Sequence, residues 1–127
     1  MPAEFRFSLQ PLLDRRRRLE EEKEHAYVAL WSELNTNLRD IARLNEALRE
    51  GTRTSRASDL AYVDAAIAAQ RHRGTQLEAA LERAREALTI ASRDRRAIEK
   101  LLERRRSACE ADCARREEME IDEANAR

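Results

Sequence analysis

The sequence predicts an all-α fold in which two long helices pack as an antiparallel coiled-coil hairpin, the second helix being the longer. Ala, Leu, Glu, Lys and Arg supply 80 of the 127 residues, more than the roughly one half that already indicates a coiled coil. From Leu60 to Glu123, positions spaced alternately three and four residues apart form one seam, and twelve of its nineteen positions are apolar. Such a stripe stays on one side of a helix only if the helix supercoils around a partner.

The first helix is expected over residues 8–50. Ser8 is a candidate N-cap, and Pro11 then falls in the first turn, where its missing N–H costs little. The apolar stripe continues through two phases separated by an extra four-residue step, which locally relaxes a left-handed supercoil. Its members are Leu9, Leu12, Leu19, Ala26, Leu30, Leu34, Ile41, Leu44 and Leu48. Gly51 is the expected helix stop.

Residues 51–58 are polar and without periodicity, so they predict the loop, and Ser58 or Asp59 can cap a second helix over 59–124. A loop this short makes the two helices antiparallel neighbours within a single domain, 1–127. Residue i then faces about residue 109 minus i, within a few positions. This register sets Asn37 near Gln70 or Gly74. The polar layer either fixes the register, as a buried Asn does in many coiled coils, or is a weak point at which the pair bends.

Beyond about Arg105 the second helix is expected to have no intramolecular partner. Its seam is also poorest there, because Asp112, Arg116 and Glu123 occupy seam positions. An unpaired helix end with a weak seam is either frayed or held by another protein.

Arginine runs form a second pattern. The register brings residues 15–18 beside residues 93–96 as one basic collar. Residues 93–106 carry seven basic and three acidic side chains, and residues 107–127 carry three and seven. The collar is either solvated helix surface or a protein-binding surface. Nucleic-acid binding has less support, because aromatic residues for base stacking are missing and acids are interleaved.

A narrow seam leaves no interior for a catalytic pocket, and we expect no enzyme activity and no cofactor. No Ser-His-Asp set or glycine-rich phosphate loop can be assembled. Cys109 and Cys113 have the wrong spacing for a CxxC pair and no histidine near them, so no metal site is expected. No apolar stretch is long enough to span a membrane. Two cysteines without an export signal indicate a reducing cytoplasm.

Large apolar residues also occur beside the seam. Trp31 and Leu38 lie one position off it, seven residues apart on one face, and Tyr62 is a similar case on the second helix. They are either flanking cover for the seam or an exposed contact strip, since Trp and Tyr are common interface hot spots. Phe5 and Phe7 precede the first helix and either staple its entry or insert elsewhere.

Both ends of the chain carry a family pattern. The opening runs F-R-F-S-L-Q-P-L-L-D from Phe5 to Asp14. The closing part runs R-R-x-I-E-K-L-x-E-R-R from Arg95 to Arg105, followed by E-E-M-E-I-D-E from Glu117 to Glu123. These segments resemble the FliJ family of flagellar type III export proteins. Stalk proteins of injectisome secretion systems share the layout and remain an alternative.

The resemblance implies a stalk-like coiled coil whose terminal end sits in the central hole of the hexameric export ATPase and promotes its assembly and activity. It also implies contact with the cytoplasmic part of the export gate, handling of export chaperones, and a cytoplasmic location, peripheral at the inner-membrane export apparatus. The matched ATPase-contact positions are Phe5, Phe7, Leu9, Leu12, Leu13, Arg96, Glu99, Arg104 and Arg105. The candidate gate contacts are Trp31, Leu38 and Tyr62. The chain alone is expected to be a monomer. The rival hypothesis is a self-assembling structural coiled coil in which the long helix pairs between chains.

Overall fold

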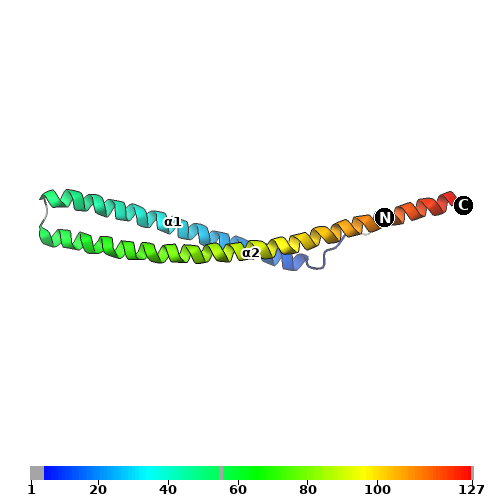
Figure 1. The fold of residues 1–127 in the computed structure, drawn as a ribbon, viewed down its shortest axis with the longest axis horizontal. Coiled ribbons are helices and arrows are strands. Elements are labelled where there is room, and N and C mark those ends of the chain that lie inside the picture. The colour runs from blue at the N-terminus through cyan, green and yellow to red at the C-terminus, as the bar shows by residue number, and fades with distance from the viewer. Residues whose placement is uncertain (1–4, 55, 127) are drawn as a thin grey trace. The chain divides into compact units, whose positions relative to one another are not determined.

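The computed structural model describes residues 5–54 and 56–126, and these form two long helices (Figure 1). α1 comprises Gln10–Thr54, 45 residues, and α2 comprises Ala57–Ala126, 70 residues. Their Ala-, Leu-, Glu- and Arg-rich sequences have the highest intrinsic helix propensities. The predicted all-α hairpin with a longer second helix is confirmed.

The connection between the helices is shorter than expected. Gly51 lies inside α1, which continues to Thr54, and no described glycine has the positive φ of a left-handed helix cap. α2 begins at Ala57, where the backbone N–H of Asp59 donates to the carbonyl of Arg56 at 3.0 Å. Ser58 and Asp59 therefore lie in the first turn of α2 and do not cap it. Of the rest of the predicted loop, Arg56 lies before α2 and Ser55 lies outside the described residues.

The chain enters α1 through a turn. The backbone N–H of Gln10 donates to the carbonyl of Phe7 at 3.0 Å, and Pro11 falls in the first turn of the helix as expected. Ser8 is not the N-cap, because α1 begins two residues later, at Gln10. The Ser8 hydroxyl accepts a hydrogen bond from Nη1 of Arg105 at 3.2 Å. The entry of α1 is therefore tied to α2.

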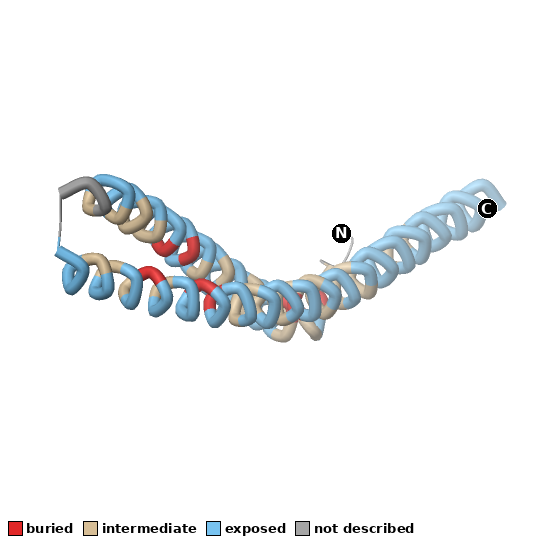
Figure 2. The backbone as a smooth tube through the Cα atoms, turned by 60° about the vertical axis from the view of Figure 1, so that its left-hand side comes forward, coloured by how far each residue is buried: buried red, intermediate tan, exposed pale blue. Residues whose placement is uncertain are grey.

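The chain forms two compact units. The terminal unit combines the residues up to Glu20 with those from Ile90 onward, and the hairpin unit comprises Glu21–Thr89. Each has a small core (Figure 2). The buried apolar side chains are Phe7, Leu13 and Ala91 in the terminal unit and Leu34, Ile67 and Leu77 in the hairpin unit.

Burial in the hairpin unit follows a regular three-four spacing on both helices. On α2 the predicted seam positions from Leu60 to Leu88 are all buried or half-buried. On α1 the buried and half-buried seam positions are Tyr27, Leu30, Leu34, Asn37, Ile41, Leu44 and Leu48. The predicted extra step through Ala26 is wrong, because Ala26 is exposed and the larger Tyr27 takes its place. Burial of the larger Tyr27 side chain removes more apolar surface from water than burial of Ala26 would, so it stabilises the fold more.

Candidate interaction surfaces

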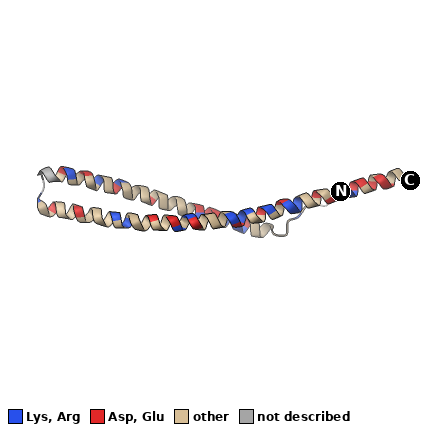
Figure 3. Ribbon diagram, viewed as in Figure 1, with Lys and Arg blue, Asp and Glu red and all other residues tan. Residues whose placement is uncertain are grey.

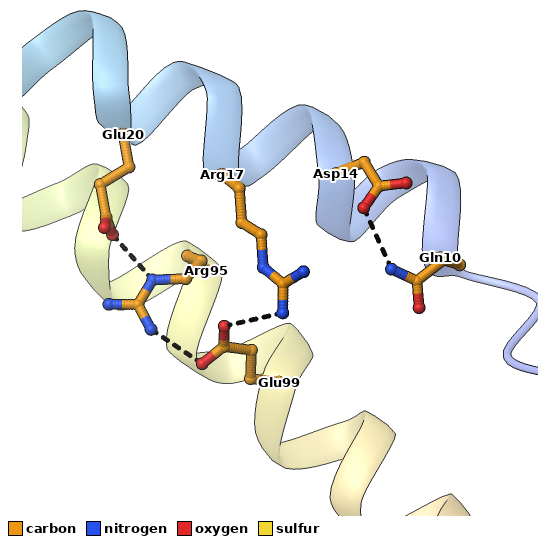
Figure 4. Close-up of polar contacts among 6 residues, drawn as sticks. All are labelled: Gln10, Asp14, Arg17, Glu20, Arg95 and Glu99. Atoms are coloured by element: carbon orange, nitrogen blue, oxygen red, sulfur yellow. Dashed lines mark hydrogen bonds and ion pairs between the residues drawn. The ribbon is translucent and has the colours of Figure 1, made fainter.

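An ionic network joins the two helices of the terminal unit around Arg95 (Figure 4). Nε of Arg95, at a seam position, donates to Oε2 of Glu20 at 2.9 Å, and its Nη1 donates to Oε2 of Glu99 at 2.8 Å. Nη2 of Arg17 reaches Oε1 of Glu99 at 3.3 Å. The side chains of Arg95 and Glu20 are only 23% and 22% exposed. These charge-assisted bonds join both helices at a level where an arginine occupies the seam position.

The network shifts the pKa values of Glu20 and Arg95. The hydrogen bond from Arg95 is the main cause that holds the pKa of the Glu20 carboxyl below its usual value, with smaller help from Ser92 and the charge of Arg96. The hydrogen bonds to Glu20 and Glu99 raise the pKa of the Arg95 guanidinium further. Each group is therefore more strongly held in its charged form than it is in water.

The predicted collar forms, but acidic side chains partly neutralise it. Arg16 pairs with Asp94 at 3.3 Å across the helices, as Arg17 and Arg95 pair with Glu99 and Glu20. The long charged side chains reach across the predicted register within a few positions. Other arginines of the terminal unit are exposed and have no hydrogen-bond or ion-pair partner among the described residues: Arg15, Arg18, Arg93, Arg96 and Arg104. Figure 3 shows this basic stretch of α2 and the more acidic end that follows it.

The segment before α1 packs along α2 further than the sequence predicts. The guanidinium of Arg105 lies 5.5 Å from the ring centroid of Phe7, and that of Arg106 lies 5.8 Å from that of Phe5. Both are cation–π distances. The contacts extend to Arg106, so the stretch of α2 with few intramolecular contacts among the described residues begins just past the predicted point, about Arg105.

A shallow hollow follows these contacts, lined by Phe5, Arg106, Cys109, Glu110, Cys113, Ala114 and Glu117. The two cysteines are free and half-buried. Burial is the main cause that raises the pKa of the Cys109 thiol, and the neighbouring Cys113 adds to it. Among the described residues no group of three or more His, Cys, Asp or Glu side chains could hold a metal ion.

The residues matched to ATPase contact divide by exposure. Phe7 and Leu13 are buried, so their side chains hold the terminal unit together and do not face a partner. The half-buried members are Phe5, Leu9, Leu12 and Glu99, and the exposed ones are Arg96, Arg104 and Arg105. The outward-facing part of the predicted set is therefore mainly guanidinium groups.

The hairpin unit presents an apolar strip on α1. Trp31 and Leu38 are 43% and 53% exposed, and Val28 extends the strip with 57% exposure. The sequence reasoning missed Val28, although it lies at the same offset from the seam as the other two. The ring of Trp31 meets that of Tyr27 edge-on, with centroids 6.4 Å apart, so the strip is anchored to the seam.

Tyr62 is exposed as well, but it does not belong to this strip. Oε2 of Glu33 pairs with Nη2 of Arg73 at 3.6 Å, so the α1 turn holding Trp31 faces the α2 turns around and beyond Arg73. Tyr62 lies eleven residues before Arg73, or about 16 Å along the helix. The three candidate gate contacts thus lie at two separate sites and do not form one continuous surface.

The family comparison decides the class of this protein. A family model described as "Flagellar FliJ protein" matches residues 5–127. The chain belongs to the FliJ family. Comparisons with curated proteins and with solved structures give no match. FliJ membership makes the chain a coiled-coil protein associated with flagellar type III export, in a family of structural export components rather than of known enzymes. Within the described ranges, neither helix is long and apolar enough to cross a bilayer.

Proposed function

We propose that this FliJ protein is a stalk whose terminal unit enters the central hole of the hexameric export ATPase and promotes its assembly and activity. Family membership associates the chain with the flagellar type III export apparatus. The single structural observation that supports the site is the set of exposed, unpaired arginines on both helices of the terminal unit. Guanidinium groups suit bonds to carboxylates and main-chain carbonyls of a surrounding protein.

The ionic network supports this proposal mechanically. Arg95 bonds to Glu20 on α1 and to Glu99 on α2, so both helices are held at the level where Arg96 projects. A surface carried by helices that are already fixed loses less conformational entropy when it binds. The network would thus present the arginines to the ATPase without being part of the contact itself.

The strip Val28, Trp31 and Leu38 is our candidate for contact with the export gate, with Tyr62 as a separate second contact. Exposed aromatic and aliphatic side chains at helical spacing are typical interface anchors. We further propose a cytoplasmic protein, peripheral at the inner-membrane export apparatus, that handles export chaperones. In this proposal the chain acts on the ATPase as a monomer.

The test is ATP hydrolysis by the cognate export ATPase with and without the protein. We expect stimulation, and we expect Arg96→Glu combined with Arg104→Glu to weaken it while helicity stays unchanged. Arg83→Glu is the matched control, because Arg83 is an exposed arginine of the hairpin unit. Equal loss in the control, or full stimulation by the double variant, would count against the terminal unit as the contact.

An injectisome stalk would give the same readout with an injectisome ATPase instead. Binding of nucleic acid through the collar would instead weaken steeply as salt rises. Lack of stimulation together with a dimer mass in light scattering would favour the self-assembling coiled coil.

A further inference from the structure

The seam of α2 continues after its intramolecular packing ends. Between Arg104 and Ala126, only Cys109 and Cys113 are half-buried, and the other side chains are exposed (Figure 2). Yet the three-four spacing persists through this stretch, and it carries the seam residues Arg105, Cys109, Asp112, Arg116, Met119 and Glu123. Arg105 contacts Phe7 and Ser8 of its own chain. The seam positions after Cys109 have no cover among the described residues, and an uncovered face with coiled-coil spacing is suited to another helix.

The charges along this seam select one arrangement. In a parallel, in-register pair each seam charge would meet its own copy, arginine on arginine and carboxylate on carboxylate. In an antiparallel pair with Asp112 opposite Arg116 of a second copy, Arg105 falls opposite Glu123 of that copy. A shift by one heptad instead sets Arg105 opposite Arg116. Because like charges in facing positions cost free energy and opposite charges gain it, only the Asp112–Arg116 register satisfies all four charges.

We propose that this part of α2 is a self-association surface, on which a second copy of the chain docks antiparallel with Asp112 opposite Arg116. The same register sets Cys109 opposite Met119 of the second copy. Met119 is 64% exposed, and Cys109 lines the hollow beside Phe5. A flexible thioether fills irregular apolar gaps well and packs favourably against aromatic rings, so Met119 fits the hollow.

The charged side chains beside the seam are partly favourable to this antiparallel register. Arg106 would lie near Glu120 of the second copy, which adds an attractive pair. Arg115 would approach Arg115 of the second copy close to the two-fold axis, which is unfavourable, but each Arg115 is already paired with Asp112 of its own chain. A two-helix contact of about twenty residues per chain with polar layers is small, so the association is weak and weakens further with salt.

The first test is the mass of the full chain by sedimentation across a concentration series at low and high salt. We expect a monomer that converts to a dimer as concentration rises, with less dimer at high salt. Arg105→Glu alone and Glu123→Arg alone should each lower the dimer fraction several-fold, and the double variant should restore it. Eighteen residues separate these two positions along one helix, so no contact within a chain explains such a rescue. A monomer at every concentration, or no rescue, overturns the proposal.

The second test determines the register of the proposed dimer by cross-linking single-cysteine variants with a short bis-maleimide. In the proposed pair the two Cys113 residues are offset by about 3 Å along the axis, and the two Cys109 residues by about 15 Å. The Cys109→Ala variant should therefore form covalent dimers, and the Cys113→Ala variant should not. Cross-linking in both variants would indicate a parallel pair and overturn the register. This proposal concerns the free protein and stands or falls independently of ATPase stimulation.

Discussion

The amide of Asn37 occupies the space that a side chain at Gly74 would need. Its Oδ1 lies 2.7 Å from the point where a Cβ on Gly74 would stand, while its Nδ2 donates to the carbonyl oxygen and to Oε1 of Gln70 at 2.8 and 2.9 Å. Asn37 is only 4% exposed, and its Oδ1 has no hydrogen-bond partner among the residues that the structure describes. The polar layer thus depends on a glycine on the opposite helix.

Gly74→Ala should destabilise the hairpin unit. The added methyl group collides with Asn37, which can move only by giving up its bonds to Gln70, and overpacking of this kind costs about 1–3 kcal/mol. The gain in helix propensity returns up to about 1 kcal/mol, so a net loss is expected in the free energy of unfolding measured with urea.

Gly51→Ala is the matched control for this substitution. Gly51 is helical and no described glycine has positive φ, so alanine should leave stability unchanged or raise it by up to about 1 kcal/mol. Equal changes in the free energy of unfolding at both positions would show that the contact between Asn37 and Gly74 does not limit the size of the side chain at position 74.

The Glu20–Arg95 pair should make a measurable but modest contribution to the free energy of unfolding. Removing Arg95 as Arg95→Ala leaves Glu20 and Glu99 without their shared partner, and removing Glu20 as Glu20→Ala leaves Arg95 with one. We expect a double-mutant cycle to give a coupling of about 1 kcal/mol, since both side chains keep some contact with water. Asp40 and Arg43, an exposed pair three residues apart on α1, provide a comparison that should couple more weakly.

Stability should also fall in acid partly through Glu20. Because the pKa of Glu20 is lower in the folded chain than its ordinary value of 4.5, its contribution is present above that value and is lost as pH falls through the folded pKa. The Glu20→Gln variant lacks this contribution. The stability difference between wild type and variant should therefore shrink below about pH 4.5, and a difference that stays constant to lower pH would refute the assignment.

Two leucines on α1 differ in burial, so their substitution by alanine should affect stability to different extents. Leu13 is fully buried in the terminal unit, and Leu13→Ala should cost about 2–4 kcal/mol. Leu38 is 53% exposed, and Leu38→Ala should change stability by less than about 0.5 kcal/mol. If the strip containing Leu38 meets the export gate, the same variant should lower binding to the gate's cytoplasmic domain while its melting temperature stays at the wild-type value.

Hydrophobic spacing predicted the two helices. The short loop between them predicted their antiparallel register and the Asn37–Gly74 meeting, because both follow from counting positions back from the loop. The ends of the helices could not be predicted in the same way. Gly51 permits a left-handed cap but does not require one, and the helix continues through it. The partners of Arg95 were also missed, since long charged side chains reach residues a turn away from the position directly opposite.

A seam of this width makes the hairpin unit a series of layers, in which each layer packs only against the neighbouring layers. Cooperativity in such an array decays with distance, as it does in repeat proteins. Loss of one layer should therefore raise amide hydrogen exchange nearby and leave remote amides as protected as before. Within the hairpin unit, the layer around Gly74 and the layer around Leu48 should consequently open to solvent independently of each other.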